Sequence, residues 1–153
     1  MTAGACVLCL GNQWHGDDGF GHHVFEHLQA LAALPPSVRL VDAGVAGLNA
    51  LAWLDGCAKA VLVDAVRVGA RVGTVHRLDP TELESPGGDF SLHELGLASL
   101  IAAHTAAGNP AELVVIGAEV GCVRAFTDAL SPPLRAAVPT AAAMVVREGW
   151  PPT

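Results

Sequence analysis

Short apolar runs alternate along the chain with segments in which apolar residues recur every three or four positions. Three runs, rich in Val, Leu and Ala, predict buried strands at Ala5–Leu10, Ala58–Ala65 and Leu113–Ala118. Two shorter runs, Ser37–Asp42 and Gly73–Leu78, predict further strands. Runs with no polar interruption are typical of parallel strands that are covered on both faces of a sheet.

Helical spacing occupies the segments between these strands. The first predicted helix carries one apolar stripe, formed by Phe20, Val24, Leu28 and Leu31. Three more helices are predicted, over Leu48–Asp55, over Glu94–Ala107 and from Pro139, which suits a first helical position, to near Gly149. Strands that alternate with helices predict an α/β fold: a three-layer, doubly wound, mostly parallel twisted sheet of about five strands with helices on both faces.

The composition fits one folded domain spanning residues 1–153. Hydrophobic residues make up 52% of the chain and charged residues only 15%, as expected for a sheet that is buried on both faces. A net charge of −7 argues against binding to nucleic acid or to an anionic membrane surface. No apolar run reaches the roughly 20 residues of a membrane span, and no charged leader precedes an apolar segment. We expect a cytoplasmic protein that acts as a monomer.

The four cysteines are expected to be small, buried and reduced hydrophobic residues. Cys6 and Cys9 have the spacing of half a zinc knuckle, but both lie in a predicted strand. Side chains three positions apart in a strand point to opposite faces, so the two thiols are not expected to share one metal ion.

Polar residues that follow the predicted strands are the candidates for chemistry, because ligands in doubly wound folds bind beyond the carboxyl ends of the strands. Asp17 and Asp18 lie in a glycine-rich turn between the first strand and the first helix, and Asp64 ends the third strand. His93 precedes the helix that is predicted to begin at Glu94. We therefore expect Asp18, Asp64 and His93 to approach one another at a single edge of the sheet.

The chemistry of these side chains favours a cation. Two adjacent aspartates make the glycine-rich turn a poor phosphate site, because their charges would repel the phosphate. Two carboxylates and one imidazole suit a borderline divalent ion such as Ni²⁺ or Zn²⁺ better than Mg²⁺. Three protein ligands would leave coordination positions open for water or for a substrate group.

Each of these residues also has a structural alternative. Either aspartate of the turn can cap the first helix, Asp64 can make a turn with its own backbone, and His93 can cap a helix. Asp42 and Glu119, which also end strands, are interpreted as loop or capping residues. Three further histidines are interpreted as a solvated helix face, namely His22, His23 and His27.

Several sequence blocks occur in an informative order. They are Gly11-Asn12 with Gly16-Asp17-Asp18-Gly19-Phe20-Gly21, Val63-Asp64-Ala65, Leu92-His93-Glu94-Leu95-Gly96-Leu97, Val115-Ile116-Gly117-Ala118-Glu119 and Leu130-Ser131-Pro132. In this order, and over nearly the whole chain, the blocks resemble the hydrogenase maturation protease family. Members of that family trim the large subunit of nickel–iron hydrogenases.

The resemblance implies an endopeptidase that removes a C-terminal extension from the nickel-loaded precursor of a nickel–iron hydrogenase large subunit. The family's three metal-contacting positions fall on Asp18, Asp64 and His93, which are thereby expected to be both the catalytic and the metal-binding residues. The implied metal is nickel, carried by the precursor or bound at the site, or another divalent ion in its place. The implied partner is the large-subunit precursor.

Two mechanisms and two other classes of function stay open at this point. The three residues can hold an ion whose bound water attacks the scissile carbonyl, or they can grasp the nickel already seated in the precursor, which we favour. A chaperone that docks on the large subunit without cutting it would carry the same motif. A nucleotide-binding regulator of flavodoxin type would instead bind phosphate in the first loop.

The chain departs from the family pattern at three places. Cys9 stands where many members have glycine, and Ala43 is the middle residue of what is usually Asp-Gly-Gly. Trp14 and His15 replace an apolar pair, so His15 is either an extra ligand or part of a substrate-facing rim. None of these changes removes an expected ligand.

Overall fold

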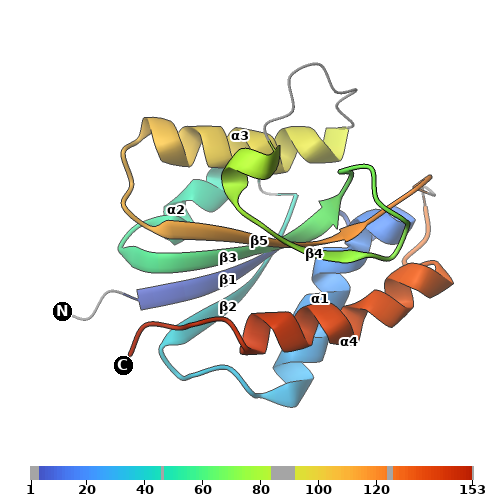
Figure 1. The fold of residues 1–153 in the computed structure, drawn as a ribbon, viewed down its shortest axis with the longest axis horizontal. Helices are drawn as coiled ribbons and strands as arrows, with labels where there is room; N and C mark the ends of the chain where they lie inside the picture. Colours follow the sequence, from blue (N-terminus) through green and yellow to red (C-terminus); the bar gives the residue numbers. More distant parts are fainter. Residues whose placement is uncertain (1–3, 46, 84–91, 124–125, 153) are drawn as a thin grey trace.

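The computed structural model describes residues 4–45, 47–83, 92–123 and 126–152, excluding the side chains of residues 47–48, 83 and 92–96. Within this part of the chain, five strands form one sheet in the order β2-β1-β3-β5-β4 (Figure 1). The strands are β1 (Gly4–Leu10), β2 (Val38–Gly44), β3 (Cys57–Val66), β4 (Val75–Leu78) and β5 (Glu112–Glu119). Neighbouring strands are parallel except at one edge, where β4 pairs with β5 in the antiparallel direction.

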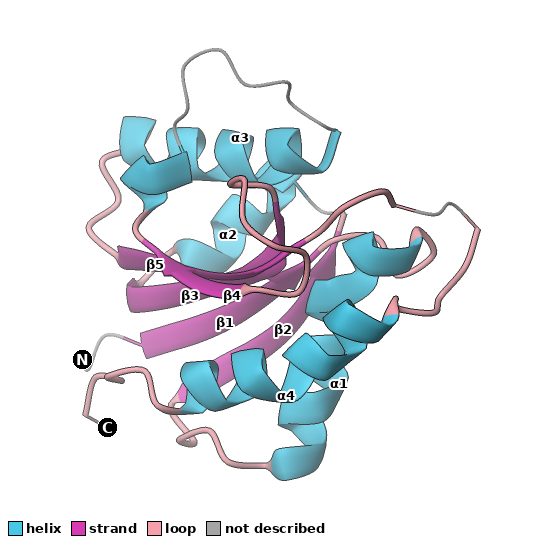
Figure 2. Ribbon diagram, turned by 45° about the vertical axis from the view of Figure 1, so that its right-hand side comes forward, coloured by secondary structure: helices cyan, strands magenta, loops and turns pink. Residues whose placement is uncertain are grey.

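Helices cover both faces of the sheet (Figure 2). On one face lie α1 (Phe20–Leu31) and α4 (Pro132–Val146), and on the other lie α2 (Leu51–Leu54) and α3 (Leu92–Ala106). The described residues also form three short 3-10 helices, η1 (Gly16–Gly19), η2 (Gly47–Ala50) and η3 (Pro80–Leu83). This arrangement confirms the predicted three-layer, doubly wound fold. None of the helices in the described ranges has the length and apolar character needed to cross a membrane.

The last helix begins at Pro132, so the predicted start at Pro139 is wrong. Ser131 is the N-cap residue and has an extended backbone, and two prolines fill the first helical positions, where no N–H donor is needed. Pro139 lies inside the helix on its exposed side. Water can therefore bind the carbonyl of Arg135 that a proline leaves without its helical partner.

Two strand boundaries differ from the predicted ones by two residues, and the others differ by at most one. β2 continues past Asp42 to Gly44. β4 begins at Val75 rather than at Gly73, because Gly73 has a positive φ of +93° and its N–H donates to the Glu119 carbonyl oxygen at 2.8 Å. Gly73 therefore belongs to the turn that precedes β4.

The cysteines of β1 face opposite sides of the sheet, as predicted. Cys6 packs in the core beneath α2 and α3, whereas Cys9 packs in the core beneath α1 and α4. Cys57 is also buried, but Cys122 is exposed. The expectation that all four cysteines are buried is therefore wrong for Cys122.

The first turn of α1 packs directly on the sheet because residue 21 is glycine. A Cβ at Gly21 would lie 2.2 Å from the Leu10 carbonyl oxygen and 2.9 Å from the Val63 carbonyl oxygen. Both atoms belong to the backbone and cannot rotate away. This close approach holds the start of α1, and the turn before it, against the ends of β1 and β3.

We predict that Gly21→Ala lowers the free energy of unfolding by about 3 kcal/mol or more, because the methyl group forces α1 away from the sheet. Urea denaturation followed by circular dichroism measures the change. Gly149→Ala is the matched control, since a Cβ at Gly149 meets no atom within 4 Å. Equal stability of the two variants would contradict the close packing of α1.

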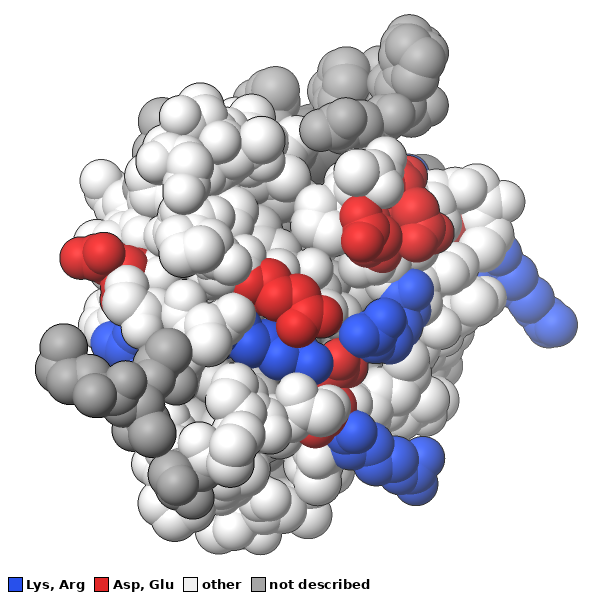
Figure 3. Space-filling view, turned by 60° about the vertical axis from the view of Figure 1, so that its left-hand side comes forward, with Lys and Arg blue, Asp and Glu red and all other residues white. Residues whose placement is uncertain are grey.

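Glu148, which follows α4, is held between two basic side chains. Lys59 Nζ lies 2.8 Å from Glu148 Oε1, and Arg77 donates to the same carboxylate through two nitrogens at 2.6 and 3.1 Å. These bonds, with that of Arg77 the largest contribution, lower the pKa of Glu148 to about 2. The cluster fastens the end of the chain to β3 and β4. On the face drawn in Figure 3, acidic and basic side chains likewise lie next to one another.

We predict that Glu148→Gln lowers the free energy of unfolding at pH 7 by about 3 kcal/mol, because it leaves the buried Lys59 without its counter-charge. A carboxylate with a depressed pKa stabilises the fold above its unfolded-state pKa and loses that effect on acidification. The gap between the variant and the unaltered protein should therefore shrink as the pH falls from about 4.5 towards 2. Glu112→Gln, at an exposed glutamate, is the control, and a gap independent of pH would contradict the assignment.

Candidate active site

The turn after β1 depends on Gly11, which lies at the carboxyl edge of the sheet. Gly11 has a φ of +116°, a conformation that strains residues with a side chain. A Cβ at this position would lie 2.1 Å from the Asp18 carbonyl oxygen and 3.3 Å from Asp64 Oδ1. The missing side chain therefore lets the backbone of Asp18 and the carboxyl group of Asp64 approach the same turn.

Asp18 and Asp64 are brought together, as the sequence predicts. Asp18 lies in η1 and Asp64 in β3, and each is 3% exposed. Asp18 Oδ2 accepts a hydrogen bond from the Asn12 N–H at 2.9 Å, and Asp64 Oδ1 accepts one from the Ala65 N–H at 2.8 Å. Burial, and after it the negative charge of Asp18, raise the pKa of Asp64 well above its usual range. The two carboxylates therefore form an acidic pair in one buried environment.

His93 lies in the first turn of α3, at the same edge of the sheet (Figure 1). α3 runs antiparallel to β3, so its N-terminus lies near the end of β3 and the start of α1. The side chain of His93 lies outside the described residues, and its approach to Asp18 and Asp64 stays a prediction. Among the side chains that are described, no group of three or more His, Cys, Asp and Glu residues is placed to hold a metal ion.

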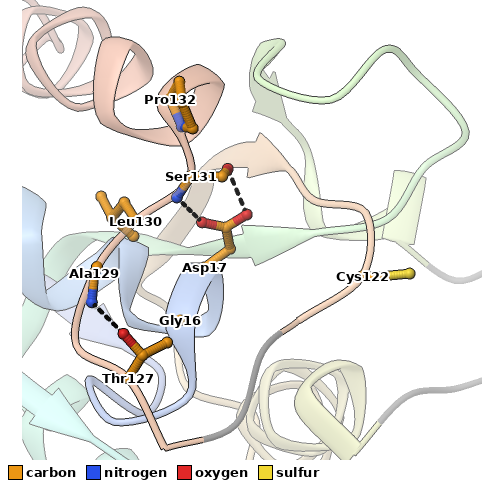
Figure 4. Close-up of a pocket in the computed structure, with 8 residues that line it drawn as sticks. All are labelled: Gly16, Asp17, Cys122, Thr127, Ala129, Leu130, Ser131 and Pro132. Atoms are coloured by element: carbon orange, nitrogen blue, oxygen red, sulfur yellow. Dashed lines mark hydrogen bonds between the residues drawn. The ribbon is translucent and has the colours of Figure 1, made fainter.

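Asp17 has a different role from its neighbour. It does not cap α1, whose N-cap residue is Gly19. Its carboxylate instead accepts hydrogen bonds from the N–H and the hydroxyl group of Ser131, each at 2.7 Å (Figure 4). Ser131 is the N-cap residue of α4, so the carboxylate also lies at the positive end of that helix dipole. Asp17 thereby connects the turn that carries Asp18 to α4.

A pocket of about 250 Å³ lies beside Asp17 (Figure 4). It is lined by Gly16, Asp17, Cys122, Thr127, Ala129, Leu130, Ser131 and Pro132. Two backbone hydrogen bonds hold Thr127 against the first turn, from Gly16 N–H to the Thr127 carbonyl at 2.8 Å and from Thr127 N–H to the Trp14 carbonyl at 2.9 Å. Sequence reasoning missed the contribution of Thr127, because nothing in its local pattern shows that the segment returns to the first turn.

Exposed aromatic side chains border this region. Trp14 is 59% exposed and Phe126 is 94% exposed. The imidazole of His15 meets the Phe126 ring edge to face, with 6.4 Å between the ring centroids. His15 therefore contacts an exposed aromatic ring beside the turn, and its role as an extra ligand or as part of a substrate-facing rim stays a prediction.

The remaining acidic strand ends make structural hydrogen bonds, as predicted. Glu119 accepts the N–H groups of Val68 and Ala70, which shapes the loop after β3. Asp42 Oδ2 lies 2.7 Å from His22 Nδ1. His23 Nε2 lies 3.0 Å from the Asp128 carbonyl oxygen. His22 and His23 are therefore partly buried, hydrogen-bonded residues, and their assignment to a solvated face is wrong.

The departures from the family pattern leave the turn intact. The positive φ at the end of β2 falls on Gly44, at +56°, and not on Ala43. The Gly11 N–H donates to the Gly44 carbonyl oxygen at 2.9 Å, which joins the two strand ends. Cys9 is buried in the core on the face opposite to Cys6. Its side chain takes the place of a glycine hydrogen there without disturbing the turn.

We predict that Asp64→Asn raises the free energy of unfolding at pH 7, because it removes a buried charge that the charge of Asp18 repels. Because folding raises the pKa of this carboxyl group, the free energy of unfolding of the unaltered protein falls as the pH rises from the unfolded-state pKa to the shifted pKa. Asparagine keeps an acceptor for the Ala65 N–H but carries no charge. Thermal unfolding measures the gain, Asp55→Asn at an exposed site is the control, and a loss of stability in Asp64→Asn would contradict the burial of a repelled charge.

The fold and the acidic pair define a doubly wound α/β protein with a candidate cation site at the carboxyl edge of its sheet. Comparison with known proteins narrows this class. The family description "Hydrogenase maturation protease" matches residues 22–148. The chain therefore belongs to the hydrogenase maturation protease family, and its class of activity is that of a peptidase.

Individual relatives agree with this assignment. The hydrogenase expression/formation protein HupD of Rhodobacter capsulatus is 31% identical over 145 residues, which cover 93% of this chain and 69% of that protein. A putative hydrogenase maturation protease of Methanocaldococcus jannaschii is 34% identical over 116 residues, or 74% of this chain and 73% of that protein.

Solved structures of the family share the fold. The hydrogenase maturating endopeptidase HybD from E. coli superposes with a TM-score of 0.78 at 25% identity, over 93% of this chain and 89% of that one. The hydrogenase 2 maturation peptidase from Thaumarchaeota archaeon SCGC_AB-539-E09 superposes with a TM-score of 0.69 at 29% identity, over 94% and 95% of the two chains. The doubly wound fold predicted from the sequence is thus the fold of these endopeptidases.

Proposed function

We propose that this protein is an endopeptidase that removes a C-terminal extension from the nickel-loaded precursor of a nickel–iron hydrogenase large subunit. One observation carries the proposal: Asp18 and Asp64 form a buried acidic pair at the carboxyl edge of a hydrogenase maturation protease fold. Family membership supplies the class of reaction. The acidic pair supplies a place for the cation that the proposed substrate carries.

The acidic pair suits a divalent cation on chemical grounds. Two buried carboxylates repel each other unless a positive charge lies between or beside them. The imidazole of His93, at the start of α3, would complete an oxygen-and-nitrogen donor set that nickel accepts. In this proposal Asp18, Asp64 and His93 grasp the nickel of the precursor, which acts as part of the substrate and positions the peptide bond for cleavage.

Asp17 is a poor candidate for the general base of the hydrolysis. Both of its carboxylate oxygens accept hydrogen bonds from Ser131, so they are already engaged in holding the start of α4. Its role in the proposal is to fix the turn that carries Asp18. In this proposal the precursor is held at Asp18 and Asp64, and its position there determines which peptide bond the attacking water reaches.

Processing of the precursor tests this proposal directly. The nickel-loaded large-subunit precursor is incubated with the protein, and its intact mass is measured over time. We predict loss of a C-terminal peptide, with a rate at least about 100-fold lower for Asp64→Asn and for His93→Ala, because each removes one ligand of the cation. A precursor without nickel should be processed slowly or not at all.

His27→Ala is the matched control, because it removes an imidazole from α1 without touching the three proposed ligands. Thermal unfolding of each variant separates loss of function from loss of structure. A stable complex with the precursor but no cleavage would contradict the protease proposal for this precursor and favour a chaperone. Equal processing of nickel-free and nickel-loaded precursors would refute the proposed role of nickel.

A further inference from the structure

Two buried thiols lie in contact at the amino end of the sheet, away from the acidic pair. Cys6 is in β1 and Cys57 is the first residue of β3. Their Sγ atoms are 3.6 Å apart, and the residues are 0% and 4% exposed. Neither thiol takes part in the proposed peptidase chemistry.

A basic side chain acts on one of the two thiols. An Nη atom of Arg39 donates to Cys57 Sγ at 3.3 Å and to the Trp53 carbonyl oxygen at 3.0 Å, and its guanidinium group stacks over the Trp53 ring. A positive charge beside a sulfur atom stabilises the negative charge that develops nearby when the sulfur reacts. Burial, together with the neighbouring Cys57, raises the pKa of Cys6 to about 12, so Cys6 stays protonated.

Cys57 also lies beside a depression in the protein surface. The depression is lined by Cys57 and by residues 51–52, 55–56, 58 and 107–110. Cys57 is 4% exposed, whereas Cys6 is 0% exposed and does not line the depression. Position and charge therefore both distinguish Cys57 from Cys6.

We propose that Cys6 and Cys57 form a dithiol site that a peroxide oxidises to an intramolecular disulfide. The sulfur of Cys57 attacks one oxygen of hydrogen peroxide, the O–O bond breaks, and a sulfenic acid forms. The departing hydroxide takes the thiol proton of Cys57 and leaves as the first water. The sulfur of Cys6 then attacks the sulfur of the sulfenic acid, the S–O bond breaks, and the S–S bond forms. The departing hydroxide takes the thiol proton of Cys6, so two thiols and one peroxide yield one disulfide and two waters.

The chain geometry allows the sulfur atoms to close the remaining distance. A disulfide needs an S–S separation of about 2.05 Å, so the atoms must approach by about 1.5 Å. Cys57 begins its strand, where the register with β1 shifts between Gly4 and Ala5. It also follows Gly56, which turns with a φ of +75°. A strand end next to a glycine turn moves more easily than the centre of a sheet.

Mass spectrometry of peroxide-treated protein tests the proposal. Cys122→Ser serves as the starting protein, because the exposed thiol of Cys122 would react on its own. After treatment the protein is denatured and its free thiols are alkylated. We expect the number of alkylated cysteines to fall from three to one, with loss of two hydrogen atoms and a cross-linked peptide that joins Cys6 to Cys57. Retention of three alkylated cysteines would overturn the proposal.

Two further variants of the same starting protein test the separate roles of the residues. Cys6→Ala should stop at a sulfenic acid on Cys57, which dimedone traps, whereas Cys57→Ala should leave Cys6 unoxidised. Arg39→Gln should slow the oxidation several-fold, because the sulfur of Cys57 loses its positively charged neighbour. Unchanged oxidation of Cys6 in Cys57→Ala would contradict the assignment. Processing of the precursor is measured separately, and its failure or success does not bear on the thiol result.

Discussion

The close approach of two acidic side chains around one glycine turn is the constraint on which the candidate site depends. Gly11 leaves room for the Asp18 backbone beside the Asp64 carboxyl group, and Gly21 lets α1 pack on the ends of β1 and β3. Both glycines are needed because a side chain at either position would collide with neighbouring backbone atoms. They hold Asp18 and Asp64, which repel each other, in a place where neither is exposed. Hydrophobic packing on both sheet faces offsets that repulsion, and a cation would relieve it.

The rest of the structure supports this turn from a distance in sequence. The carboxylate of Asp17 binds Ser131 at the start of α4, and the backbone around Thr127 pairs with the turn from the other side. At its far end α4 is followed by Glu148, which is fastened to β3 and β4 through Lys59 and Arg77. α4 therefore lies between the turn at the carboxyl edge and the ion pairs that Glu148 makes just after the helix.

The sequence was sufficient to predict the sheet and the acidic pair, because both follow from local patterns. Uninterrupted apolar runs marked the central strands, and the rule that ligands bind beyond the strand ends selected Asp18 and Asp64. Long-range contacts could not be predicted in this way. The bond between Asp17 and Ser131 joins residues 114 positions apart, and the start of α4 was misplaced because Pro139 has the features of a first helical residue. The pairing of Cys6 with Cys57 likewise depends on the order of the strands.

Measuring the pKa of Asp64 tests most directly whether Asp18 and Asp64 share one buried site. Carbon-13 NMR of the carboxyl groups, recorded against pH for the unaltered protein and for Asp18→Asn without added metal, gives the pKa of Asp64 in each. The account predicts a pKa well above the usual aspartate range in the unaltered protein and a lower pKa once the charge of Asp18 is removed. An ordinary pKa that does not respond to Asp18→Asn would show that the two carboxylates do not share one site.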